Sequence, residues 1–187
     1  MISLCQEVFE KTEYSSKIVV IIISSQMPKR KRKEERKMTL SEKEHLLLKD
    51  MKGQEELCIE KYTRYAEMAK SPELKTLFED LATTEREHLN TINVIAEGNV
   101  PPLTQKVTAP ECKKCEPYAY TPEDKKADQL LLSDMLATEK HVSSLYDTSI
   151  FEFSSPELRA TLNHIQTEEQ QHGEKIYAYM KCNNMYS

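Results

Sequence analysis

Residues 85–88 read Glu-Arg-Glu-His and residues 169–172 read Glu-Gln-Gln-His, so one Glu-x-x-His motif recurs 84 residues further along the chain. A lone glutamate stands 30 residues ahead of each motif. Within each motif the glutamate and the histidine are three residues apart, which places both side chains on one face of a helix. The spacing therefore predicts helices that carry six polar residues at matching positions: Glu55, Glu85, His88, Glu139, Glu169 and His172.

The repeat extends beyond these six residues. Residues 46–88 align without a gap on residues 130–172, and the alignment pairs identical Leu-Leu-Leu-x-Asp-Met, tyrosine and Ser-Pro-Glu-Leu elements. Such internal similarity is typical of a duplicated supersecondary unit. The Ser-Pro pairs at 71–72 and 155–156 each suit a helix start, with Ser as the N-cap and Pro at the first helical position. The repeated unit is therefore predicted to be a helical hairpin.

Apolar residues recur at helical period through both halves of the repeat. The expected helices span residues 41–70, 72–97, 122–153 and 156–181. Ser41 with Glu44 predicts a capping box, Thr121 with Asp124 a second cap, and Gly98 a helix end. The predicted fold class is all-α: a four-helix bundle of two hairpins, 41–97 and 122–181, joined by the long crossover 98–121, all within a domain of residues 38–187.

The six repeated polar residues fall in the middle of the apolar stripes, where charged residues are not expected. Four buried carboxylates close together would cost many kcal/mol or be forced into protonation. Two divalent cations carry the four positive charges that balance four glutamates beside neutral histidines. The pattern therefore predicts a dinuclear metal site, and the alternative is a degenerate site that keeps the residues without binding metal.

With its two Glu-x-x-His motifs and two further glutamates, the chain resembles ferritin-like proteins, which include bacterioferritins, rubrerythrins and manganese catalases. This resemblance implies a ferritin-like bundle holding two divalent ions, iron or manganese. It also implies that Glu85 and Glu169 bridge the ions while Glu55 and Glu139 bind terminally. Val142 stands where rubrerythrins carry an extra glutamate, and the chain has a single Cys-x-x-Cys, so an electron-transfer rubrerythrin is not expected.

Over roughly residues 39–187 the chain resembles more closely the coat F family, spore coat proteins of endospore-forming bacteria. The residues that carry this resemblance are Leu46–Cys58, Leu130–Tyr146 and Tyr179–Tyr186. The family implies a spore-associated protein without an agreed enzymatic activity, made in the cytoplasm of the mother cell and then placed in the spore coat. Its partners would be other coat proteins or further copies of itself.

Two classes of function stay open. In one, the bundle is a coat component whose metal is structural or vestigial. In the other, the chain is a di-iron or di-manganese oxidoreductase that acts on peroxide or oxygen. The family resemblance favours the coat role, and the intact ligand set favours the chemistry.

Residues 1–37 do not share the helical pattern. Their apolar run at 18–23 is too short for a membrane span or a signal-peptide core. The basic run at 29–37 can be encoded by purine-only codons shortly before Met38, as a translated ribosome-binding site would be, so we expect a non-native extension or a disordered tail. These residues carry a net charge of +4, and the rest of the chain carries −9. The acidic charge of residues 38–187 argues against nucleic acid as a partner.

Several other tyrosine, cysteine and histidine residues bear on the site. Tyr62 and Tyr146 lie seven residues beyond Glu55 and Glu139 and are interpreted as core residues, with donors to the ligands or radical relays as alternatives. Cys58 is expected in the core. The pair Cys112 and Cys115 has open roles: exposed loop thiols, a redox pair, half of a shared zinc site or cross-linking thiols. Three histidines lack a metal-ligand partner in the repeat and are left out of the site: His45, His141 and His164.

Overall fold

The computed structural model describes residues 37–102 and 116–186. Four helices form in this part of the chain, and it contains no strand, which confirms the all-α class. The expected extension at residues 1–37, apart from Lys37, and the pair Cys112 and Cys115 lie outside the described residues. No helix in the described ranges is long and apolar enough to cross a membrane.

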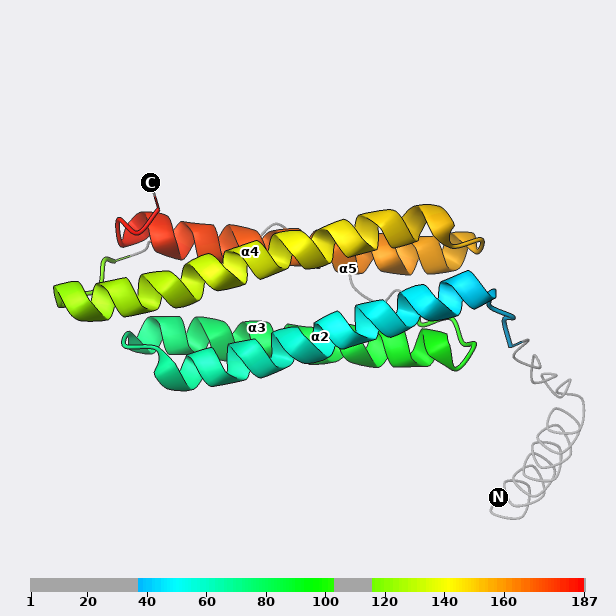
Figure 1. Cartoon of the computed structure of the whole chain (residues 1–187), viewed down its shortest axis with the longest axis horizontal. Coiled ribbons are helices and arrows are strands. Elements are labelled where there is room, and N and C mark those ends of the chain that lie inside the picture. The colour runs from blue at the N-terminus through cyan, green and yellow to red at the C-terminus, as the bar shows by residue number, and fades with distance from the viewer. Residues whose placement is uncertain (1–36, 103–115, 187) are drawn as a thin grey trace, which may run out of the picture. The chain divides into compact units, whose positions relative to one another are not determined.

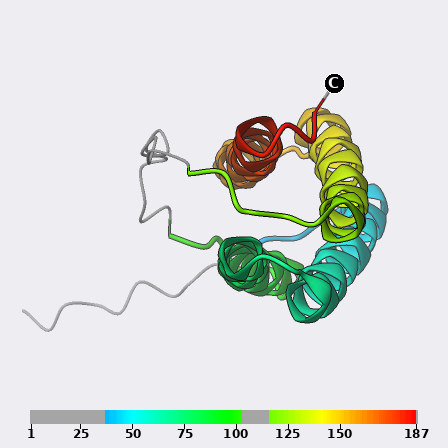
Figure 2. The same ribbon diagram turned by 90° about the vertical axis from the view of Figure 1, so that its left-hand side faces the viewer.

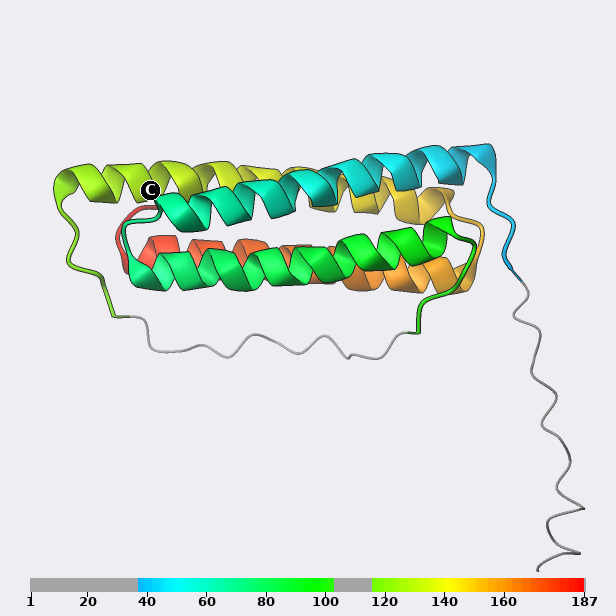
Figure 3. The ribbon, with the colours of Figure 1, turned by 90° about the horizontal axis from the view of Figure 1, so that it is seen from below.

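Each observed helix agrees with its predicted counterpart to within two residues at either end. The helices are α2 (Glu42–Met68), α3 (Pro72–Ala96), α4 (Pro122–Glu152) and α5 (Pro156–Cys182). Helix α2 packs along α3 and α4 packs along α5, while α2 also contacts α4 and α3 contacts α5 (Figures 1 and 2). Helices α3 and α4 run in the same direction, so α4 begins at the end of the bundle opposite to the end of α3 (Figure 3).

The helix starts follow the capping chemistry of the sequence. Ser41 and Glu44 form the predicted capping box: the Ser41 backbone N–H donates to Glu44 Oε2 at 2.7 Å and the Glu44 N–H donates to Ser41 Oγ at 3.2 Å. Thr121, Ser71 and Ser155 are the N-caps of the other three helices, each followed by proline at the start of the helix. Two of these caps, Ser71 and Ser155, lie in the hairpin turns and mark where the second helix of each hairpin begins.

Gly98 ends α3 as expected and does so in a conformation that suits glycine. Its φ is +82°, in the left-handed region, and an added Cβ would lie 2.9 Å from the backbone oxygen of Met38. Met38 donates its backbone N–H to the Gly98 oxygen at 2.8 Å. A side chain at position 98 would therefore both strain the turn and separate it from the segment before α2.

One apolar core runs through the bundle and fills the space between the four helices. Cys58 is fully buried within it, as predicted. The other large side chains that are fully buried include Met51, Phe78, Leu81, Ile92, Leu132, Met135, Phe153 and Leu158. Each of these contributes about 1.5–3 kcal/mol to folding through removal of apolar surface from water, so the core is able to offset the burial of polar groups at its centre.

Each hairpin turn is held by a buried carboxylate from the other hairpin. Asp128 in α4 is fully buried and accepts the backbone N–H groups of Lys70 at 2.9 Å and Ser71 at 3.1 Å, in the turn between α2 and α3. Glu44 in α2 accepts the N–H of Ser154 at 2.8 Å and its hydroxyl at 3.0 Å, in the turn between α4 and α5. Glu44 and Asp128 occupy equivalent repeat positions, so each hairpin stabilises the turn of the other.

Candidate metal centre

The structure brings all six residues expected from the sequence to the centre of the bundle. Each helix contributes at mid-length: Glu55 from α2, Glu85 and His88 from α3, Glu139 from α4, and Glu169 and His172 from α5. None of their side chains is more than 3% exposed. Six ionisable groups thus occupy a region that the surrounding apolar residues shield from water.

These residues divide into two overlapping groups of four. One group is Glu55, Glu85, His88 and Glu169, and the other is Glu85, Glu139, Glu169 and His172. Within each group, one ligand atom per residue can be chosen so that all four lie within 4.8 Å of one another. We name the two groups the His88 position and the His172 position.

Glu85 and Glu169 belong to both positions, and their oxygens are divided between them. Glu85 places Oε2 at 3.2 Å from His88 Nδ1 and Oε1 at 3.0 Å from His172 Nδ1. Glu169 places Oε1 at 3.0 Å from His88 Nδ1 and Oε2 at 3.6 Å from His172 Nδ1. The other two glutamates approach one imidazole each, Glu55 Oε2 at 3.7 Å from His88 and Glu139 Oε2 at 3.5 Å from His172. Two carboxylates therefore lie between the positions, and two lie at the outer sides.

Without metal, protons have to balance the charge of this cluster. Burial, reinforced by the neighbouring carboxylates, raises the pKa of Glu55 to about 8 and raises that of Glu139 in the same direction. For Glu85 and Glu169 burial also acts to raise the pKa, but the imidazoles outweigh it and lower both values. Burial opposes the charged imidazoles, yet their bonds to carboxylates raise the pKa of both His88 and His172. The metal-free cluster is thus neutral when two glutamates and both histidines are protonated.

The two tyrosines that the sequence assigned to the core do lie in it, and they also contact the cluster. Tyr62 donates its hydroxyl to Glu139, and Tyr146 donates to Glu55. Their position two turns from Glu55 and Glu139 on the same helix faces predicted a place in the core or a donor role toward the ligands, without naming the glutamate that each contacts. The structure pairs each tyrosine with the glutamate of the other hairpin, because α2 and α4 are neighbours in the bundle.

Glu168 is a residue that the sequence analysis missed. Its Oε2 lies 3.0 Å from His88 Nε2, and His164 Nε2 lies 3.4 Å from the same oxygen. A carboxylate on the far nitrogen of a metal-binding histidine fixes the ring and its tautomer. His164, which was left out of the site, therefore lies behind Glu168 and not among the ligands. The repeat gives no signal for this role, because the residue equivalent to Glu168 in the first hairpin is Thr84, which has no carboxylate.

The other imidazole lacks such a partner. His172 Nε2 is buried and has no hydrogen-bond partner among the described residues. Thr84 directs its hydroxyl to the Asp80 carbonyl of its own helix at 3.5 Å. His45 and His141 are both exposed and belong to neither position. The two positions therefore have the same ligand types but different surroundings.

The structure thus defines an all-helical protein with a pair of buried Glu3His groups at its centre. Residues 127–187 match the family model of the Coat F domain. The match covers most of α4 and all of α5, and so includes Glu139, Glu169 and His172; it supports the coat F resemblance in this part of the chain. Neither a curated protein nor a solved structure matches the chain.

Proposed function

We propose that the chain is a dinuclear metal-binding protein of the spore coat, built as a ferritin-like bundle. The observation that carries the metal site is the division of carboxylate oxygens: Glu85 and Glu169 each offer one oxygen to the His88 position and one to the His172 position. These two would bridge a pair of divalent ions. Glu55 with His88, and Glu139 with His172, would complete the two coordination sets.

The chemistry of the donor atoms fits metal ions. Among the described residues, four buried carboxylate oxygens have no hydrogen-bond donor: Glu55 Oε2, Glu139 Oε2 and both oxygens of Glu169. They lie within ion-pair distance of the imidazoles, but the geometry is not that of hydrogen bonds. Buried acceptors without donors are strongly disfavoured, and two divalent ions would both engage them and cancel four carboxylate charges. Carboxylate and imidazole ligands suit iron and manganese.

The spore-coat role rests on the Coat F match at residues 127–187. All six proposed ligands point into the bundle, which leaves its outer faces available for assembly with other coat proteins or with copies of the chain. Several large apolar side chains are exposed on those faces: Leu46, Leu57, Met68, Leu130 and Phe151. In this proposal the protein is made in the mother cell and is then incorporated into the coat, with no nucleic acid as a partner.

A second candidate function is oxidation or reduction of peroxide or oxygen at the metal pair. The observation that favours it is a pocket that includes Glu139 and Glu169 in its lining. Iron or manganese, when bound, would supply the redox chemistry. The protein's own contribution would be to hold the carboxylates, exclude bulk water and keep the histidines in place.

The test of metal binding is anaerobic loading with Fe(II) or Mn(II), followed by metal analysis and equilibrium titration. Wild type is expected to bind two ions per chain. The Glu85→Ala variant should bind weakly because both positions lose a shared ligand, whereas Glu87→Ala, which removes an exposed glutamate two residues away, should match wild type. Binding of no ion or a single ion by wild type would contradict the dinuclear proposal.

The two functions separate in spores that carry Glu85→Ala. If the bundle is a coat component, the variant should localise and assemble like wild type, and only loss of the whole chain should alter the coat. If redox chemistry is its purpose, the same spores should localise the protein normally but become sensitive to peroxide. A variant that folds but fails to assemble would contradict the inward-facing role assigned to the ligands.

A further inference from the structure

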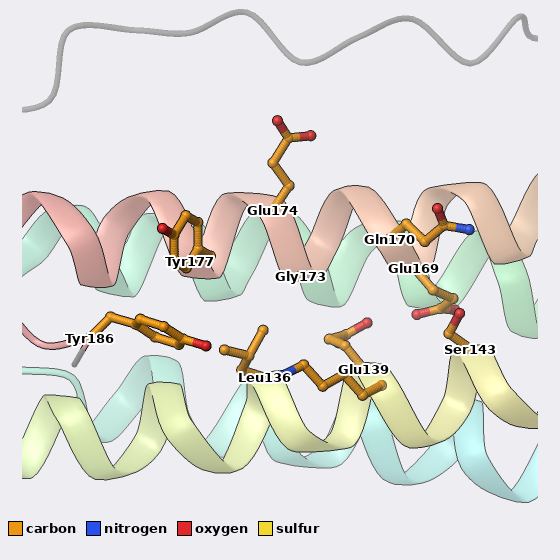
Figure 4. Close-up of a pocket in the computed structure, with 10 residues that line it drawn as sticks. Leu136, Glu139, Ser143, Glu169, Gln170, Gly173, Glu174, Tyr177 and Tyr186 are labelled. Atoms are coloured by element: carbon orange, nitrogen blue, oxygen red, sulfur yellow. The ribbon is translucent and has the colours of Figure 1, made fainter.

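A pocket of about 500 Å³ lies between α4 and α5. Its rim carries the exposed residues Lys140, Gln170 and Glu174, and its lining includes Glu139 and Glu169, which are at most 2% exposed. In Figure 4 these two glutamates face each other across the space between the helices. The pocket therefore reaches from the protein surface to two residues of the His172 position, Glu139 and Glu169.

Gly173 lines this pocket directly after the histidine of the site. Glycine in the middle of a helix costs about 0.5–1 kcal/mol relative to alanine, so its presence within α5 calls for a local reason. The equivalent residue of the other hairpin, 84 positions earlier, is Leu89 in α3. The two halves thus carry a large side chain at one position and none at the other.

The space at Gly173 faces α4. A Cβ built there would lie 3.7 Å from Leu136 Cδ1, at ordinary contact distance. A methyl group therefore fits, while a longer side chain would extend across the gap between the two helices. On the far side of Leu136, Tyr177 and Tyr186 meet edge to face with ring centroids 4.9 Å apart and form one wall (Figure 4).

We propose that this pocket admits a small exogenous ligand to the His172 position, so that the two metal positions differ in function. The inference rests on the proposed metal site and adds where a ligand enters. The ligand class is a compact oxygen or nitrogen donor of the size of azide or hydrogen peroxide. A pocket of this volume holds on the order of fifteen waters at about 30 Å³ each, so size does not exclude such a molecule.

The surroundings of His88 disfavour the alternative in which the small ligand reaches the His88 position. Glu168 and His164 occupy the far side of that imidazole, with Glu168 3.0 Å from its Nε2. A second pocket, near Gly53 and His141, includes none of the six ligands in its lining. The His88 position is accordingly the fixed one, and the His172 position is the one that a small ligand reaches.

Azide titration of the protein loaded with two Co(II) ions, followed by visible absorption, tests the proposal. Gly173→Leu should weaken azide binding at least tenfold while two Co(II) ions remain bound. Gly53→Leu is the matched control, because it also replaces a glycine inside a helix but has nothing within 4 Å of an added Cβ and lies in the other pocket. It should bind azide like wild type.

Variants that lose one outer carboxylate show which of the two positions binds azide. Glu55→Gln and Glu139→Gln each remove one outer carboxylate charge while keeping an oxygen that accepts the tyrosine hydroxyl. Azide binding should survive Glu55→Gln and be lost in Glu139→Gln. The reverse pattern would overturn the proposal, as would equal azide affinity in Gly173→Leu and wild type.

Two further measurements distinguish failure of the entry route from failure of folding or of metal binding. If Gly173→Leu does not fold, Leu136→Phe narrows the same pocket from α4 and is expected to weaken azide binding in the same way; unchanged affinity in that variant would also refute the proposal. If wild type binds no Co(II), Fe(II) or Mn(II), the metal site itself fails. Binding of two ions with azide affinity indifferent to every pocket variant rejects only the entry route.

Discussion

Replacing Asp128 by Ala removes the carboxylate that holds the turn between α2 and α3. The backbone N–H groups of Lys70 and Ser71 lose their acceptor, and Ser71 is fully buried. Tyr120 also donates to Asp128, at 2.8 Å, but it keeps a second contact with the Tyr179 hydroxyl at 2.8 Å. The penalty therefore comes mainly from the buried backbone donor of Ser71, with a smaller part from that of Lys70, which is an exposed residue.

A buried donor left without an acceptor costs about 1–3 kcal/mol, and only the Ser71 donor is buried, so Asp128→Ala should lower the free energy of unfolding by about 2 kcal/mol. Urea unfolding of the metal-free protein measures this directly; with a slope of about 2 kcal/mol per molar urea, the midpoint should fall by about 1 M. Hydrogen exchange at Lys70 and Ser71 should accelerate more than exchange at the opposite turn.

The matched control is Asp147→Ala, which removes an exposed carboxylate from the same helix and should change stability by less than about 0.5 kcal/mol. Asp128→Asn keeps one acceptor oxygen and should fall between wild type and Asp128→Ala. A loss below about 1 kcal/mol for Asp128→Ala would show that the turn closes without this carboxylate and would refute the reasoning.

Three other predictions concern the Glu44 carboxylate, the Glu168 carboxylate and the bound metal ions. Burial acts to raise the pKa of Glu44, but its hydrogen bonds from Ser154 and Ser41 outweigh burial and lower the pKa to about 2 from its ordinary 4.5. Its ionised form therefore stabilises the fold above about pH 4.5, and this contribution is lost as the pH falls toward 2. Glu44→Gln should accordingly be less stable than wild type at pH 6, with a difference that shrinks in unfolding curves at pH 2.5; a constant difference would contradict the assignment. Glu168→Gln should weaken metal binding at the His88 position by about 10- to 100-fold, measured by competition titration in the Glu139→Gln background, and should have little effect in Glu55→Gln. Metal at about 100 times its dissociation constant should stabilise the fold by about 2.7 kcal/mol and raise the melting temperature, whereas a melting temperature indifferent to metal and chelator would indicate that no ion binds.

The helices and the six residues of the cluster could be predicted because they depend on spacing within single helices. Glu85 and His88 are three residues apart, and the Ser-Pro turns bring Glu55 back beside them; both facts follow from helix geometry. Helix ends were predicted for the same reason, since the capping residues act within a few positions of the chain.

Contacts between hairpins could not be read from the sequence. Glu44 and Asp128 stand at equivalent repeat positions, but they are different residues, and each acts on a turn of the other half. Tyr62 was placed on the right face and given no definite partner, because its partner depends on how α2 packs against α4. Glu168 stands next to Glu169, a proposed ligand, yet its contact with His88 appears only once α3 and α5 are placed together. Tertiary packing decides all three.

The exchange of contacts between the two halves has a consequence for how the chain is divided. Tyr62 meets Glu139 while Tyr146 meets Glu55, and Glu44 and Asp128 each close the turn of the opposite half. Reciprocal contacts of this kind are what a twofold axis produces between identical subunits. The two hairpins therefore pack like the identical subunits of a homodimer joined into one chain, and the interface between them forms the core of the bundle. Each hairpin lacks the carboxylate that holds its own turn, and neither hairpin alone contains all four residues of a proposed metal position. A cut within the connecting segment would therefore leave two pieces that need each other to fold.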